Sequence, residues 1–239
     1  MRVSDAVLPC LPAEKGQPCR MFAGALFDWD GVIVDSHRQH EMAWEALATE
    51  LGQPLPPGFF KATFGMRNDR IIPEFSGWVP DGDPQRIAEL GDRKEALYRE
   101  VIRRDGIEPL PGVVRLLTAL SDAGIPCAVG SSTSRENILT IVEITGLGPF
   151  FAGIAAEKDV TRGKPAPDVF LKAAEKIGRD PGQCVVFEDA HVGVEAGRAA
   201  GAKVVAVATT HPAVSFIGKA DLIAETLEAV TLERLQGLF

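Results

Sequence analysis

The sequence predicts an α/β fold in which a Rossmann-like parallel sheet forms a core and a helical cap domain is inserted after the first strand. Short apolar runs alternate with segments of helical periodicity in the C-terminal half, which is typical of a parallel sheet covered on both faces. An earlier stretch shows helical periodicity alone, and polar residues follow several of the apolar runs. We therefore expect three parts: an N-terminal extension at 1–20, a core at 21–36 and 109–239, and the cap at 37–108.

The first strand is expected at 23–27, where five apolar or small residues precede a turn that contains Gly31. Asp28 and Asp30 follow this strand directly. In an open α/β sheet, ligands bind beyond the carboxyl ends of the strands. Two carboxylates placed there can divide the work, one attacking an electrophile or holding a metal while the other transfers a proton. Acidic residues are common in turns, so this interpretation depends on the strand before the pair and the glycine after it.

The cap is expected to be entirely helical. Apolar residues recur with helical spacing from Ser36 to Leu51, and Asp35 or Ser36 is the candidate N-cap of that helix. Turns rich in proline and glycine follow, and a second helix is expected at 87–102.

After the cap, helices and strands alternate, which implies a parallel sheet with helices on both faces. The expected helices are 113–123, 135–145, 167–177 and 192–200. The expected strands are 125–130, 153–156, 184–187, 203–207 and a short last strand near 221–223.

Polar side chains follow two further strands of this sheet, and a lysine lies in a loop between them. Because the carboxyl ends of parallel strands meet at one edge, we expect these side chains to lie close to the carboxylates that follow the first strand. They are Ser131, Ser132 and Thr133 after 125–130, Lys164 in a loop rich in glycine and proline, and Glu188 and Asp189 after 184–187.

Together these residues resemble the four motifs of the haloacid dehalogenase-like superfamily of phosphotransferases, in the same order along the chain. The resemblance covers roughly residues 21–235 and implies a capped, Rossmann-like fold and phosphate-ester chemistry. Asp28 and Asp30 fit the first motif, Ser131 the second, Lys164 the third, and Glu188 with Asp189 the fourth.

The resemblance implies a role for each core residue. Asp28 is the candidate nucleophile, which forms an aspartyl-phosphate and so divides one difficult displacement into two. Asp30 is the candidate general acid and base, which protonates the leaving alcohol and then deprotonates the attacking water. Lys164 and Ser131 would stabilise the transferring oxygens, although two neighbouring hydroxyl residues compete with Ser131 for this role.

Mg²⁺ is the expected cofactor, because two carboxylates so close together repel a phosphoryl group unless a cation intervenes. Mg²⁺ takes oxygen ligands from one or two carboxylates together with phosphate and water. The expected ligands are a carboxylate oxygen of Asp28, the backbone carbonyl of Asp30, and Asp189, with Glu188 acting directly or through water. Glu188 and Asp189 are also placed to cap the helix at 192–200, where carboxylates favour the helix N-terminus.

Two candidate substrate-binding residues, His40 and Lys94, resemble cap residues of the β-phosphoglucomutase branch of this superfamily. In that branch the histidine of a similar pattern, Ser36-x-x-x-His40-x-x-x-Trp44 in this chain, approaches the active site. Each has an alternative interpretation. His40 is equally a structural residue at the end of an apolar helix face, and Lys94 is equally part of a solvated face in a charged run.

Arg67, Ser132 and Arg135 complete the candidate substrate-binding set. The mutase pattern places an arginine where this chain has Asn68, and a mutase needs such an anchor for the distal phosphate of its bisphosphate intermediate. This departure weakens the case for a mutase. Arg135 is equally an exposed charge in the first turn of its helix.

Residues 65–68 and 132–135, with Trp78, also resemble plant phosphatases of riboflavin synthesis, which act on a phosphorylated ribitylamino-pyrimidine. We therefore expect a Mg²⁺-dependent phosphatase of a small phosphorylated metabolite: a sugar, polyol or nucleotide-like phosphate. The alternatives are a β-phosphoglucomutase-like sugar phosphomutase and an inactive binding protein on the same fold. The fate of the aspartyl-phosphate separates the first two, because water releases phosphate whereas a returning sugar phosphate accepts it.

The composition sets further expectations. A formal net charge of −8 argues against nucleic acid or an anionic membrane as the main partner. No apolar run reaches the length of a membrane span, and the N-terminus lacks the apolar region of a signal peptide, so we expect a cytoplasmic protein. The expected oligomeric state is a monomer or a weak homodimer. Cys127 and Cys184 are expected to be buried, and a disulfide between Cys10 and Cys19 is disfavoured in a reducing cytosol.

Overall fold

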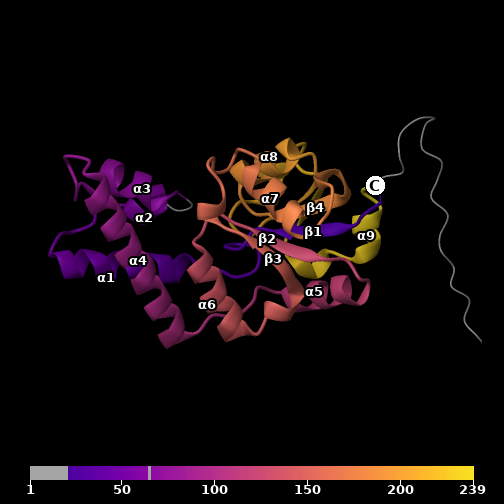
Figure 1. The fold of residues 1–239 in the computed structure, drawn as a ribbon, viewed down its shortest axis with the longest axis horizontal. Coiled ribbons are helices and arrows are strands. Elements are labelled where there is room, and N and C mark those ends of the chain that lie inside the picture. The colour runs from indigo at the N-terminus through magenta and orange to yellow at the C-terminus, as the bar shows by residue number, and fades with distance from the viewer. Residues whose placement is uncertain (1–20, 64–65) are drawn as a thin grey trace, which may run out of the picture.

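A six-stranded, all-parallel sheet forms the centre of the computed structural model, which describes residues 21–63 and 66–239 (Figure 1). The strand order is β3-β2-β1-β4-β5-β6, which confirms the predicted fold class and puts the carboxyl end of β1 between those of β2 and β4. The strands are β1 (Gly24–Phe27), β2 (Cys127–Gly130), β3 (Phe151–Ala155), β4 (Cys184–Glu188), β5 (Lys203–Val207) and β6 (Leu222–Ala224).

Helices cover both faces of the sheet (Figure 1). The side chains of β1 alternate between two hydrophobic clusters, since Ala25 and Phe27 belong to one and Leu26 to the other. The first cluster includes residues of α5 (Val113–Asp122), α6 (Arg135–Thr145) and α9 (Leu232–Gln236), and the second includes residues of α7 (Asp168–Lys176) and α8 (His191–Ala199). A sheet covered in this way is buried on both sides, as its apolar strands require.

The segment between β1 and α5 folds as a group of helices, which lies to the left of the sheet in Figure 1. The two long helices of the group, α1 and α4, bury Trp44 and Tyr98 in one hydrophobic cluster. The elements are α1 (His37–Leu51), α2 (Phe59–Thr63), α3 (Asn68–Ile71), a π-helical turn (Ile72–Ser76) and α4 (Pro84–Asp105).

The predicted cap helices are present, but two details differ. The helix expected at 87–102 begins earlier, because the Asp83 side chain accepts a hydrogen bond from the backbone N–H of Gln85 and Pro84 occupies the first helical position. Ser36 makes no capping hydrogen bond to α1, because its hydroxyl donates to Asp30 instead. The short helices α2 and α3 have too few residues to show a helical period, so the sequence did not reveal them.

The two chain segments that join these helices to the core lie side by side. Val34 and Pro109 form an antiparallel bridge, and the backbone N–H of Leu110 donates to the carbonyl oxygen of Ile33 at 2.8 Å. The chain therefore enters and leaves the helical group through one hydrogen-bonded crossing. The division into a core and a cap at this crossing stays a prediction.

Cys127 and Cys184 are buried free thiols, as predicted. The extension at 1–20, with the pairing of Cys10 and Cys19, lies outside the described residues. Among the residues described, no helix combines the length and the apolar character that a bilayer crossing needs. The cytoplasmic location and the monomeric or weakly dimeric state stay predictions.

Candidate active site

Asp28, Lys164 and Glu188 form the centre of the site, at the carboxyl ends of β1 and β4. The backbone N–H of Asp28 donates to the Phe187 carbonyl at 3.0 Å, which holds the two strand ends side by side. Lys164 Nζ lies 2.6 Å from Asp28 Oδ1 and 2.6 Å from Glu188 Oε1, and its side chain is only 7% exposed. Burial opposes the charge on Lys164, but the two carboxylates outweigh it and raise the lysine pKa.

Asp28, Glu188 and Asp189 each offer a carboxylate oxygen, and these oxygens all lie within 4.8 Å of one another. Burial raises the pKa of Glu188 against the effect of Lys164. Burial and then the charges of Glu188 and Asp28 raise the pKa of Asp189 well above its ordinary value. Crowded, desolvated carboxylates offering oxygen ligands alone fit a hard divalent cation such as Mg²⁺, whose charge would offset their repulsion.

Two hydroxyl residues after β5 contact the site, one at a carboxylate and one at the turn after Asp30. Thr210 donates a hydrogen bond to Asp189 Oδ2, and Thr209 donates to the carbonyl oxygen of Gly31. Gly31 has φ +81°, and a Cβ there would collide with the carboxylate of Asp189, so the turn after Asp30 requires glycine. We did not predict Thr209 and Thr210, although they lie in the loop that follows β5.

Asp30 lies beside this group, but its carboxylate contacts other residues, Ser36 and His40. Ser36 donates a hydrogen bond to Asp30 Oδ1, and His40 Nε2 lies 4.0 Å from the same oxygen. Burial raises the pKa of Asp30 to about 7, and the hydrogen bond from Ser36 opposes that rise. A carboxyl group with such a pKa can both give and take a proton near neutral pH.

His40 and Lys94 meet in the structure as a buried pair. Lys94 is 3% exposed, and its Nζ lies 2.7 Å from His40 Nδ1, so the interpretation of Lys94 as part of a solvated helix face is wrong. The His40 ring stacks on Tyr98 with the ring centroids 4.0 Å apart. Burial and then the nearby lysine lower the pKa of His40 to about 3, so this imidazole is neutral at neutral pH.

Glu95 joins this pair to the core. Its Oε1 accepts hydrogen bonds from Lys94 Nζ at 2.8 Å and Asn68 Nδ2 at 2.7 Å, while its Oε2 accepts from Asn137 of α6 at 2.5 Å. Burial opposes ionisation of Glu95, but Lys94, His40 and Asn137 together outweigh it and lower the pKa of Glu95 to about 2. Sequence reasoning missed Glu95 and Asn137, because both lie within helices and carry no strand-end signal.

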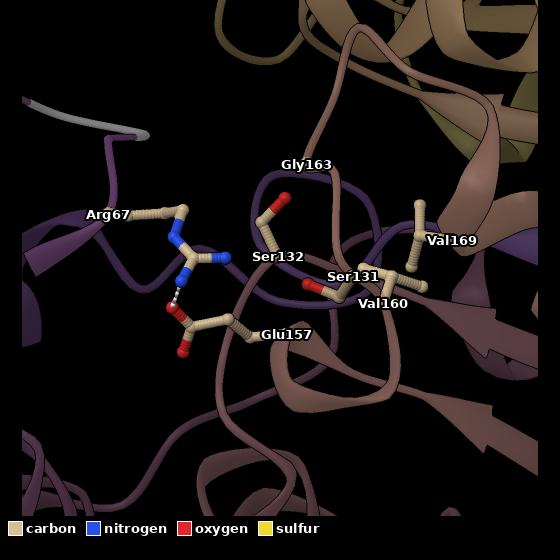
Figure 2. Close-up of a pocket in the computed structure, with 7 residues that line it drawn as sticks. All are labelled: Arg67, Ser131, Ser132, Glu157, Val160, Gly163 and Val169. Carbon is tan, nitrogen blue, oxygen red and sulfur yellow. Dashed lines mark ion pairs between the residues drawn. The ribbon is translucent and has the colours of Figure 1, made fainter. Parts of the chain in front are cut away.

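A small pocket lies where Arg67 reaches the loops after β2 and β3 (Figure 2). Arg67 Nη2 lies 3.2 Å from Glu157 Oε1, and the cavity is about 10 Å³, the room of about one water molecule. The predicted residues Ser131 and Ser132 both line it. The full lining is Arg67, Ser131, Ser132, Glu157, Val160, Gly163 and Val169.

Among the described contacts, those of Arg135 are with the end of β3 and the loop after it. Its Nη2 donates to the Ile154 carbonyl at 2.9 Å and to Asp159 Oδ2 at 2.6 Å. These contacts tie the start of α6 to the end of β3, and a role of Arg135 toward substrate stays a prediction. Glu157, in the neighbouring loop, was not predicted, although it follows the end of β3.

Comparison with known families supports the same chemistry. Residues 22–201 match the family model described as haloacid dehalogenase-like hydrolase. Among curated proteins, hexitol phosphatase A of Escherichia coli is 36% identical, with 88% of this chain and 94% of that protein aligned. The β-phosphoglucomutase of Mycobacterium tuberculosis is 34% identical, with 78% of each chain aligned.

A plant phosphatase is also similar. The chloroplastic 5-amino-6-(5-phospho-D-ribitylamino)uracil phosphatase of Arabidopsis thaliana is 32% identical over 90% of this chain, which spans only 57% of that protein. Among solved structures, a family IA hydrolase of Entamoeba histolytica superposes with a TM-score of 0.80 and 26% identity, covering 90% of this chain and 98% of that one.

Proposed function

This chain belongs to the haloacid dehalogenase-like hydrolase family, and we propose on that basis that it is a Mg²⁺-dependent phosphatase of a small phosphorylated metabolite. The observation that carries the proposal is the buried group of Asp28, Lys164 and Glu188 beside Asp30. This group offers a nucleophile, a fixed positive charge and a proton carrier in one site. A sugar, polyol or nucleotide-like phosphate is the proposed substrate class, which the names of two phosphatase relatives support.

In the proposed reaction, Asp28 attacks the phosphorus and forms an acyl-phosphate bond while the ester P–O bond breaks. Asp30 gives its proton to the departing oxygen, which leaves as an alcohol. A water molecule then attacks the phosphorus, Asp30 takes the proton of that water, and inorganic phosphate leaves with the Asp28 carboxylate restored. Lys164 and Ser131 bind the phosphoryl oxygens, and the hydrogen bond from Ser36 orients Asp30.

Asp28 and Asp189, with the backbone carbonyl of Asp30, are the proposed holders of the Mg²⁺ ion, and Glu188 acts directly or through water. A bound divalent cation would neutralise charge on the phosphoryl group and on the carboxylates around it. Support comes from the three buried carboxylates whose oxygens converge within 4.8 Å. The hydrogen bond from Thr210 fixes the orientation of the Asp189 carboxylate.

Mg²⁺ binding is expected to stabilise the folded protein, because a ligand at 100 times its Kd adds about 2.7 kcal/mol to the free energy of unfolding. For a chain of 239 residues this corresponds to a rise of roughly 5–10 °C in the unfolding midpoint. Calorimetric unfolding of the metal-free protein, titrated with MgCl₂ at constant ionic strength, measures the shift. Asp189→Asn should lose most of it.

Asp35→Asn is the matched control, since Asp35 is an exposed carboxylate in the same loop as Asp28 and Asp30. This variant should keep the whole Mg²⁺ shift. An equal shift in Asp189→Asn would contradict the assigned site, because the cation would then bind elsewhere.

The activity test is phosphate release from a panel of phosphorylated sugars, polyols and nucleotides in the presence of Mg²⁺. We expect free phosphate from a narrow group of monophosphates and none after chelation of the metal. The panel includes a hexitol phosphate and a ribitylamino-pyrimidine phosphate, since two relatives are named for such substrates. No phosphate release from any member, with no isomerisation, would favour the inactive binding protein.

A sugar phosphomutase is the second candidate function. The β-phosphoglucomutase relative and the buried His40–Lys94 pair favour it, whereas Asn68 in place of an arginine does not. Phosphorus NMR of the same reaction mixtures separates the two functions. Conversion of β-glucose 1-phosphate to glucose 6-phosphate, with little free phosphate and a need for a bisphosphate primer, would replace the phosphatase proposal with the mutase.

A further inference from the structure

Two cations of the helical group, Lys94 on α4 and Arg67 just before α3, reach the catalytic loops of the core. Lys94 lies against His40, whose ring faces Asp30. Arg67 lies beside the hydroxyl residues after β2, in the pocket of Figure 2. A second phosphate on the leaving group of a substrate would need a cation of this kind as its partner.

Lys94 is already neutralised by a carboxylate from its own helix. Glu95 Oε1 lies 2.8 Å from Lys94 Nζ, and the two side chains are 17% and 3% exposed. Asn68 and Asn137 donate to Glu95 as well, which fixes the carboxylate beside the lysine. Any phosphate that approached Lys94 would therefore meet a buried, ionised carboxylate at the same place.

Arg67 is paired with two carboxylates, because Asp69 Oδ2 of α3 lies 2.9 Å from Arg67 Nη2 and a second carboxylate approaches from the core side. Glu157 Oε1 lies 3.2 Å from Arg67 Nη2, and the Glu157 side chain is 24% exposed and lines the pocket. Figure 2 shows the guanidinium and the carboxylate facing each other beside Ser132. A phosphate could enter this pocket only by displacing Glu157 from Arg67, and it would then lie beside the negative charge of Glu157. A hydroxyl group carries no charge, so the Glu157 carboxylate does not repel it.

Several neutral polar groups lie near these ion pairs. The amides of Asn68 and Asn137 and the hydroxyls of Ser132 and Thr133 can each give or take a hydrogen bond without adding net charge. Lys94 and Arg67 are both paired with carboxylates of this chain. The neutral donors and acceptors near them match the hydroxyl groups of a polyol or sugar.

We propose that the leaving group of the substrate is a neutral, hydroxyl-rich group, and that Glu95 and Glu157 exclude substrates with a second phosphate. This inference rests on the proposed phosphatase function and narrows its substrate class to monophosphates of polyols or sugars. Glu95 and Glu157 thereby act as specificity-determining residues through charge, since each occupies the cation that a distal phosphate would need.

The test compares a monophosphate with the bisphosphate of the same carbon skeleton as competitive inhibitors of 4-nitrophenyl phosphate hydrolysis. Glucose 6-phosphate and glucose 1,6-bisphosphate form one such pair, and fructose 1-phosphate with fructose 1,6-bisphosphate forms another. In the unmodified protein the bisphosphate should have an inhibition constant at least about tenfold higher than the monophosphate, because like charges repel. Glu157→Gln should lower the bisphosphate-to-monophosphate ratio of inhibition constants by about tenfold.

Glu74→Gln is the matched control, because it breaks the exposed Arg70–Glu74 ion pair in the same helical group but away from the pocket. This variant should leave the ratio unchanged. Glu95→Gln should lower the ratio of inhibition constants as Glu157→Gln does. If Glu95→Gln fails to fold because Lys94 is buried without its carboxylate partner, the result for Glu157→Gln still tests the inference. A bisphosphate that competes as well as the monophosphate, or a ratio unmoved by Glu157→Gln, would overturn the inference alone. Absence of any 4-nitrophenyl phosphate hydrolysis would instead overturn the phosphatase function on which it rests.

Discussion

Asp28→Asn is expected to lower kcat for every substrate by about 10⁴-fold or more, the size of loss seen when a covalent nucleophile is removed. An amide oxygen carries no negative charge, so it forms no stable bond to phosphorus under these conditions. The fold should persist, because asparagine has the shape of aspartate and Lys164 keeps its contact with Glu188 at 2.6 Å. Steady-state phosphate release at saturating Mg²⁺, together with calorimetric unfolding, measures both quantities.

The control for this experiment is again Asp35→Asn, which removes an exposed carboxylate of the same loop and should keep near-normal turnover. Trapping the phosphoenzyme by acid quench adds a second measurement. Labelled phosphate should be recovered on the unmodified protein and on Asp35→Asn but not on Asp28→Asn. Turnover by Asp28→Asn within about tenfold of normal would assign the nucleophile to another residue.

Asp30→Asn is expected to slow the first chemical step in proportion to how poor the leaving group is. An alkyl alkoxide needs a proton as it departs, so release of an alcohol should fall by about 10²–10⁴-fold. The 4-nitrophenolate ion is stable without a proton, so its release should fall about tenfold or less. Rapid mixing resolves this step, because it measures the first turnover before any hydrolysis of the aspartyl-phosphate.

The same variant should accumulate the phosphoenzyme when 4-nitrophenyl phosphate is the substrate, because Asp30 is also the proposed base for the attacking water. A burst of nitrophenolate followed by slow turnover is the expected trace. Equal losses for the alkyl and aryl esters in the first turnover would contradict the role of Asp30 as an acid. Ser36→Ala, which removes the hydrogen bond to Asp30, should give a smaller change in the same direction.

The core of the site was predictable because its residues follow one local rule. Asp28 and Ser131 each come directly after an apolar strand, Glu188 is the last residue of another, and a parallel sheet brings those strand ends to one edge. Lys164 does not follow a strand end; its loop rich in glycine and proline made it a candidate, and the family resemblance gave it a role. The structure puts its ammonium group between two carboxylates that lie 136 and 24 residues away along the chain.

The contacts across the cap were not predictable in the same way. Glu95 and Asn137 are 42 residues apart and lie on different helices, so their hydrogen bond depends on how the helical group docks on the core. Periodicity within either helix carries no information about that docking. Glu157 and Thr210 differ, since they lie in the loops that follow β3 and β5, and a search of those whole loops rather than of the first residue alone would have found them.

The crossing formed by Val34 and Pro109 joins both ends of the helical group to the rest of the chain at one place. Its two ends meet at one hydrogen-bonded pair of backbone segments, so the sheet is continuous around it and no strand is interrupted. Recombination at this point could replace residues 37–105 without altering Asp28, Lys164 or the carboxylates after β4. Such an exchange would replace His40, Lys94 and Glu95, and so part of the proposed substrate contacts, while the core would still supply Asp28, Lys164 and Glu157.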